Sequence, residues 1–192
     1  MGESEDKLLE IWEKHRTTFE GSTEDIERVE QAVKSIVASP SSSSGQKEVE
    51  EKSETDLRRE IDNMGIPEKI KLAMFGPKAA RMILISDKNR MVQDCVLQNP
   101  RLSIAEVEEF ALNPNTPEQV LRIITNNRDW VKTQSMKRAL LFNPKTPVDS
   151  SLKFLKLMPT NDLRRIARSK NLPQVLASSA QRLLTVRSKK PT

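Results

Sequence analysis

The chain contains one cysteine, one histidine and no tyrosine in its 192 residues. A single cysteine, Cys95, excludes an intrachain disulfide and the multi-cysteine sites that bind zinc or iron–sulfur clusters. Because Cys95 lies on an apolar stripe, we predict a small core residue rather than a reactive thiol. The one histidine, His15, lies between Lys14 and Arg16 and far in sequence from a group that could orient it for catalysis. We therefore predict a solvated surface histidine.

Glycine and aromatic residues are also scarce, with five glycines and an aromatic share of 4%. A β-sandwich or barrel needs turn glycines and side chains that fill the pleats, so this composition speaks against a β-fold. The sequence has no run of 18 apolar residues, and we expect no membrane span. The first 20 residues are acidic and lack the apolar core of a secretory signal peptide. We therefore expect a cytoplasmic protein without a membrane contact.

The net charge of +5 hides an uneven distribution along the chain. Residues 1–63 hold 17 acidic and 9 basic side chains, a balance of −8. The remaining 129 residues hold 10 acidic and 23 basic side chains, a balance of +13. The two parts have fields of opposite sign, and the basic part would attract an acidic partner.

The N-terminal segment, residues 1–38, is predicted to form an acidic helical hairpin. Apolar residues recur at helical spacing in residues 4–19 and again in residues 26–37, with Gly21 at the turn between them. Two helices are too few for a stable core, so the hairpin must pack on the rest of the chain or on another molecule. Trp12 is its best candidate for a partner anchor, because so small a segment has little interior for an indole.

Residues 39–55 have the composition of a flexible linker, rich in serine at the start and charged afterwards. From residue 56 onward one helical pattern follows another, and no alternating pattern is long enough for a strand. Three junctions in this part, residues 99–103, 113–117 and 143–147, begin with Asn-Pro and lead to Ser or Thr. Asn tolerates a left-handed backbone and can end a helix, and Pro stops its continuation. The Ser or Thr is then expected to cap the next helix, with a following Pro in its first turn.

A longer repeat underlies these junctions. Residues 89–92 match residues 127–131 at a spacing of 38, and a partial third unit starts at Asn161. The junctions at Asn99 and Asn143 are 44 residues apart, so the second unit contains six extra residues. Periods of this size are typical of stacked helical pairs. We therefore predict four segments: the hairpin of residues 1–38, the linker of residues 39–55, a helical repeat domain of residues 56–186 and a basic disordered tail of residues 187–192.

The pattern Val-x-x-x-Val-x-x-Asn-Pro-x-Leu/Thr-Ser/Pro resembles the leucine-rich-repeat-variant and HEAT-like α-solenoid class. Further segments are similar to an uncharacterised family of bacterial, mostly deltaproteobacterial, proteins: residues 70–73, 126–130, 142–147, 162–164 and 169–171. The resemblance covers roughly residues 66–184 and implies an all-α fold, a short right-handed α-solenoid preceded here by the tethered hairpin. It implies no activity. Some leucine-rich-repeat-variant proteins carry a cysteine cluster for an iron–sulfur centre, which this chain lacks, so we expect no cofactor and no metal.

The sequence contains none of the common catalytic motifs: no glycine-rich phosphate loop, no pair of histidines at metal-ligand spacing and no nucleophile elbow. Residues 163–168 place three arginines, Arg164, Arg165 and Arg168, opposite an apolar helix face. Lys170 extends this basic face, which is either a solvated surface or a site for an acidic partner. Trp130 with Arg128, at a predicted helix start, is either core or a second partner anchor.

We expect a non-enzymatic adaptor that binds protein partners through a rigid helical-repeat surface and the tethered N-terminal segment. The hairpin could engage a second partner, a second copy of the chain through residues 1–38, or the basic domain of its own chain. The alternative is a nucleic-acid-binding module for DNA, RNA or the ribosome, which uses the basic face. An enzyme of the base-repair class remains a third option, with Asp129 and Trp130 as its only candidate residues.

Overall fold

The computed structural model describes residues 3–16, 23–38 and 54–188. The predicted turn at Gly21, most of the predicted linker and residues 189–192 of the predicted tail lie outside these ranges. The chain divides into two compact units, residues 1–103 and 104–192. The division falls inside the predicted repeat domain and places the N-terminal hairpin in one unit with the start of that domain. No helix in the described ranges is long and apolar enough to cross a membrane.

The described residues form α-helices and short turns, with no strand among them, which confirms the all-α class. The helices of the first unit are α1 (Glu3–Arg16), α2 (Thr23–Ala38), α4 (Glu54–Asn63), α5 (Ile66–Phe75), α6 (Lys78–Leu84) and α7 (Arg90–Leu97). Helix α5 begins after Gly65 with Pro67 in its first turn, and it ends at Gly76. Both ends follow the expected chemistry, since Pro suits a first turn and the Gly76-Pro77 pair interrupts the helix.

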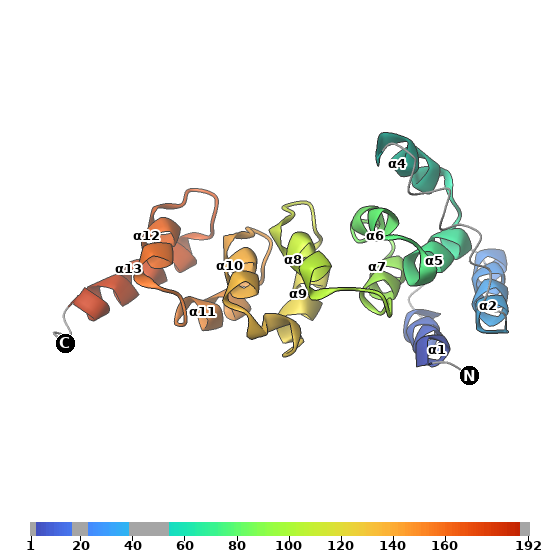
Figure 1. The fold of residues 1–192 in the computed structure, drawn as a ribbon, viewed down its shortest axis with the longest axis horizontal. Coiled ribbons are helices and arrows are strands. Elements are labelled where there is room, and N and C mark those ends of the chain that lie inside the picture. The colour runs from blue at the N-terminus through green and yellow to red at the C-terminus, as the bar shows by residue number, and fades with distance from the viewer. Residues whose placement is uncertain (1–2, 17–22, 39–53, 189–192) are drawn as a thin grey trace. The chain divides into compact units, whose positions relative to one another are not determined.

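The N-terminal hairpin packs on its own unit: α1 lies beside α7 and α2 beside α5 (Figure 1). The side chains that α1 buries are Leu8, Ile11 and Trp12, and α2 buries Val29 and Val33. Trp12 is only 4% exposed, so the prediction of an exposed anchor on this hairpin is wrong. The hairpin finds its core on α5 and α7, and the indole is part of that core.

A buried carboxylate fastens α1 to α7. Asp94 Oδ2 accepts a hydrogen bond from Lys14 Nζ at 2.7 Å and lies 2.8 Å from His15 Nε2. The prediction of a solvated His15 is therefore wrong, because the residue is 8% exposed and its partner is 79 positions away in sequence. The second oxygen, Asp94 Oδ1, is buried without a hydrogen-bond partner among the described residues. A buried carboxylate loses its hydration, and the cationic side chain of Lys14 and the imidazole of His15 compensate for that loss at Asp94.

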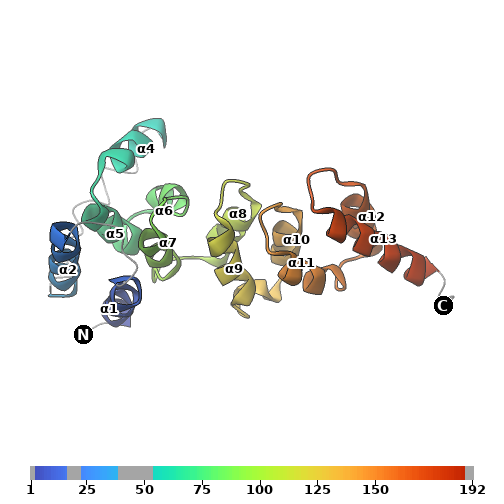
Figure 2. The same ribbon diagram turned by 180° about the vertical axis from the view of Figure 1, so that it is seen from behind.

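The second unit contains α8 (Ile104–Leu112), α9 (Glu118–Asn126), the short 3₁₀ helix η2 (Trp130–Lys132), α10 (Gln134–Phe142), α11 (Val148–Leu155), α12 (Thr160–Arg168) and α13 (Gln174–Ser188) (Figure 2). Helix α10 starts after Thr133, which has an extended backbone. The Thr133 hydroxyl accepts a hydrogen bond from the backbone N–H of Met136 at 3.3 Å and so caps the new helix. The 3₁₀ helix η2 and its turn therefore lie between α9 and α10.

The Asn-Pro junctions share one set of contacts. Asn99, Asn113 and Asn143 each accept, through Oδ1, the backbone N–H two residues ahead. The amide nitrogen of Asn99 also donates to the carbonyl of Ala73 at 2.7 Å, and that of Asn143 donates to the carbonyl of Ala111 at 2.8 Å. Each of these two asparagines therefore holds the end of one helix against the end of an earlier one.

The backbone of these asparagines differs from the expected one. Asn143 has φ −83° and ψ 119°, and no residue in the described ranges has a positive φ. A left-handed Asn was expected to end each helix. The extended conformation is favoured over the left-handed one because a residue before proline is largely confined to it. It also points the side chain towards the neighbouring carbonyl.

The threonines of the junctions also act differently from the prediction. Thr116 and Thr146 were expected to cap the following helices, but Pro117 and Pro147 occupy the cap positions of α9 and α11. The threonine hydroxyls point back instead, to the carbonyls of Phe110 at 2.7 Å and Leu140 at 2.6 Å. Both threonines are buried. They therefore satisfy carbonyls at the end of the preceding helix that burial would leave without water.

Replacement of Asn143 tests the junction. Asn143→Ala should lower the free energy of unfolding by about 2 to 3 kcal/mol, because buried carbonyls lose their donor. Asn143→Asp should cost more, since it keeps the acceptor but turns a carboxylate oxygen towards two carbonyls, those of Ala111 and Asn113. Urea denaturation measures both variants, with exposed Asn115→Ala as the control. Equal stability of Asn143→Ala and Asn115→Ala would contradict the assigned role.

Replacement of Asp94 tests the attachment of α1. In a Trp130→Phe background, the fluorescence of Trp12 reports whether α1 stays docked. Asp94→Ala should destabilise the first unit by about 2 to 3 kcal/mol and expose Trp12 to acrylamide quenching, because His15 loses its buried partner. Asp62→Ala, an exposed acidic residue on α4, serves as the control. If Trp12 stays protected in Asp94→Ala, the carboxylate does not hold the helix.

Candidate functional site: a basic surface on α12 and α13

The last part of the chain carries charge of a single sign. Residues 163–192 contain eight lysines and arginines and no acidic residue. The whole second unit, residues 104–192, contains 16 basic and 7 acidic residues, a balance of +9. Such an excess of cations at one end of a protein produces a positive potential that attracts anionic groups.

Helix α12 separates its apolar and basic residues onto two faces. Leu163 and Ile166 are fully buried, whereas Arg164, Arg165 and Arg168 are exposed. This confirms the arrangement that the helical wheel predicts for the three arginines. Lys170 is exposed in the turn that follows α12, so the basic face continues past the helix end.

The one carboxylate at the start of α12 is already neutralised within the unit. Asp162 is buried, and its Oδ2 accepts from Arg138 of α10 through Nη2 at 2.8 Å and Nε at 2.9 Å. Two donors from one guanidinium on the same oxygen form a strong, oriented contact. The pair leaves α12 without an acidic group that could offset its arginines.

The predicted arginines are not equivalent. The guanidinium of Arg165 stacks over Phe142, with its Cζ atom 4.8 Å from the centre of the ring. Arg164 donates a hydrogen bond from Nη1 to Asn161 Oδ1 at 3.4 Å. Stacking on an aromatic ring fixes a guanidinium and keeps its N–H groups available for an anion. Arg168 and Lys170 have no ion pair or side-chain hydrogen bond among the described residues. The structure therefore brings these four predicted residues together on one surface, two of them unpaired.

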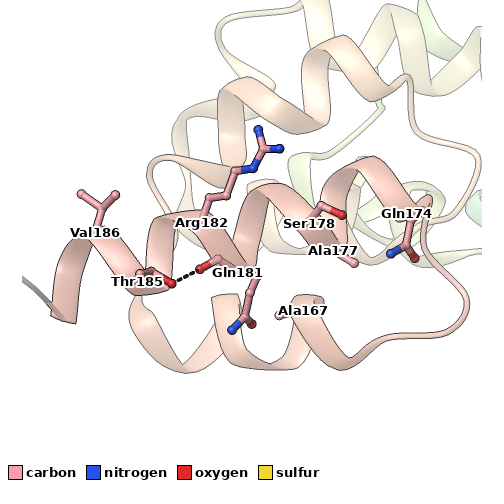
Figure 3. Close-up of a pocket in the computed structure, with 8 residues that line it drawn as sticks. All are labelled: Ala167, Gln174, Ala177, Ser178, Gln181, Arg182, Thr185 and Val186. Atoms are coloured by element: carbon pink, nitrogen blue, oxygen red, sulfur yellow. Dashed lines mark hydrogen bonds between the residues drawn. The ribbon is translucent and has the colours of Figure 1, made fainter.

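A shallow groove, open to solvent, runs along α13 next to this surface and has a volume of about 720 Å³ (Figure 3). It is lined by Ala167 of α12 and by Gln174, Ala177, Ser178, Gln181, Arg182, Thr185 and Val186 of α13. In Figure 3, Gln181 extends towards Ala167. Sequence reasoning missed this groove because its lining residues are small or neutral. These residues recur at helical spacing on α13, but they match no sequence motif that indicates a binding site.

Arg187, which was assigned to a disordered tail, belongs to α13 and anchors it. Its guanidinium donates to the carbonyls of Met158 at 2.7 Å and Lys156 at 3.0 Å. These carbonyls close the turn after α11, where water or a side chain must satisfy them. The contact is 29 residues away in sequence, so composition alone suggested a solvated tail.

The second predicted group, Arg128 and Trp130, lies at η2 and away from the α12 arginines in sequence. Trp130 is half-buried, and Arg128 is exposed. Asp129 is exposed and pairs with Lys132 at 2.7 Å, which holds the pKa of the Asp129 carboxyl below its usual value. A half-buried tryptophan is compatible with both alternatives left open by the sequence, a core residue and a second partner anchor.

No described group of three metal-binding side chains is arranged to hold a metal ion. Cys95 is fully buried, which confirms the prediction of a core residue, and burial raises the pKa of its thiol far above the usual value. Comparison with protein-family models, with curated proteins and with solved structures found no match to this chain.

The Arg138–Asp162 pair offers a direct test of the architecture beneath the basic face. Arg138→Ala should lower the free energy of unfolding by about 1 to 3 kcal/mol, because it leaves the buried carboxylate of Asp162 without its partner. Arg122→Ala removes an ion pair whose two side chains are more than half exposed, and it should have no measurable effect. Thermal unfolding of both variants measures the two losses of stability. Equal losses would show that Asp162 does not need the guanidinium.

Proposed function

We propose that the protein is a non-enzymatic adaptor whose helices stack as a short α-solenoid and whose basic α12–α13 surface binds an acidic protein partner. The observation that carries this proposal is the unopposed charge of the surface. Residues 163–188 contain six cations and no carboxylate, and Asp162 itself is paired with Arg138. An anionic partner would pair with Arg168 and Lys170, which make no ion pair or side-chain hydrogen bond among the described residues.

The recurring junction contacts support the stacked arrangement. Asn99 and Asn143 make the same pair of hydrogen bonds in the two units, and Thr116 and Thr146 repeat another. Equivalent residues that make equivalent contacts are typical of repeat proteins, in which each helix pair rests on its neighbour. The rigidity that such contacts give would reduce the cost of ordering the backbone when the surface binds a partner.

In this proposal the acidic hairpin of α1 and α2 covers the first helices of the array. Terminal repeats need a polar outer side, and the hairpin supplies one while it buries apolar side chains on α5 and α7. The apolar side chains that the structure describes as buried on these helices, Leu8, Ile11, Trp12, Val29 and Val33, pack within their own unit, which argues against self-association through residues 1–38.

A pair of double variants tests the surface. Arg164→Glu with Arg168→Glu changes the basic face, and Lys153→Glu with Lys156→Glu makes the same change of charge on exposed lysines outside α12 and α13. In affinity capture from native lysate, acidic proteins retained by the wild type should be lost by at least about tenfold in the first variant and kept in the second. Equal retention by both variants would contradict the proposal.

Duplex DNA and RNA test the alternative function on the same variants. The proposal expects no saturable binding at about 50 mM salt. Tight binding that falls steeply by about 200 mM salt, and that Arg164→Glu with Arg168→Glu abolishes, would establish the nucleic-acid module instead.

A further inference from the structure

The groove beside the basic face has a neutral floor with hydrogen-bonding groups in a row. Gln174, Ser178, Gln181 and Thr185 follow one another at spacings of four and three residues, which places them on one side of α13. Among the described residues, the side chains of Gln174, Ser178 and Gln181 make no hydrogen bond. Amide and hydroxyl groups both donate and accept, which is what the N–H and C=O groups of a peptide backbone require.

The sides of the groove provide charge and a small apolar element. Arg182 lines it and has no ion pair within the described part of the chain. Arg164 and Arg168 are exposed on α12, three positions before Ala167 and one after it, and lie outside the lining itself. Val186, at the far end of the lining, is 58% exposed and gives an apolar contact. A ligand in this groove would therefore meet cations at its edges and neutral polar groups along its length.

The dimensions suit an extended chain. The lining of α13 runs from Gln174 to Val186, which spans about 18 Å at the rise of an α-helix. An extended peptide covers this length with about five to six residues. The floor contains Ala167, Ala177 and Ser178, whose short side chains let a backbone approach closely.

A nucleic acid fits the lining less well. None of the eight lining residues is aromatic. Unpaired bases would therefore find no ring in the groove on which to stack.

We infer that the groove between α12 and α13 binds an extended acidic segment of a protein, with its backbone on the Gln and Ser row and its carboxylates on Arg182, Arg164 and Arg168. This inference rests on the proposed function and deepens it, since it names the bound segment and the place where it lies.

The test uses the full chain and a fluorescein-labelled decapeptide of alternating Asp and Val, followed by fluorescence anisotropy. Arg182→Glu reverses the charge in the groove, and Ser178→Trp fills its floor. Each variant should weaken peptide binding by at least about tenfold. Lys153→Glu and Leu157→Trp make matched changes at exposed positions outside the groove and should change binding less than about twofold. Circular dichroism confirms that each variant is folded.

The possible outcomes separate the two claims. If the peptide binds and depends on Arg164 and Arg168 but not on Ser178→Trp, the surface binds acidic partners and the groove inference is wrong. If the Asp-Val peptide binds no better than a Lys-Val decapeptide, both claims are wrong. Tighter binding of a ten-nucleotide oligothymidylate than of the acidic peptide would overturn the groove inference and favour the nucleic-acid alternative.

Discussion

The buried Asn143 at the Asn-Pro junction after α10 is the contact on which the rest of the second unit depends. Asn143 shapes its own turn through Oδ1 and holds the ends of α8 and α10 together through its amide nitrogen. A side chain that bridges two backbones in this way leaves few alternative packings, because each unmade hydrogen bond would cost free energy in the interior. The position of α12 and its arginines follows from this framework, since α10 supplies both Arg138 for Asp162 and Phe142 for Arg165.

Much of the fold could be predicted from sequence, because its signals are local. Helices are indicated by the periodicity of apolar residues, by Pro and Gly at the helix ends and by the absence of alternating patterns. The described residues are indeed helical with short turns. The two faces of α12 follow from the same periodicity, so Arg164, Arg165 and Arg168 were identifiable as exposed cations. The junction chemistry was harder. Asn-Pro predicts a corner, but which carbonyl the amide or the threonine hydroxyl meets depends on the neighbouring helix.

Contacts between distant residues account for what the sequence did not reveal. Trp12 looked exposed because the two-helix segment has too little core of its own, and His15 looked solvated because it lies between two cationic residues. The partner of His15, Asp94 of α7, follows 79 residues later, and Trp12 is buried in the unit where α1 packs on α7. Arg187 looked like part of a tail for the same reason. The groove could not be predicted for another reason. In the sequence, a row of Gln, Ser and Thr residues is indistinguishable from an ordinary solvated helix face, and only the structure places α12 beside it.

The account of function therefore centres on one end of the chain, where unopposed cations flank a neutral groove. The most direct measurement is chemical-shift mapping of ¹⁵N-labelled full-length protein during titration with an acidic peptide. The account predicts saturable shifts confined to the amides of α12, α13 and the turn between them. Shifts spread evenly over the basic residues of the second unit, or centred on η2 and Trp130, would contradict it.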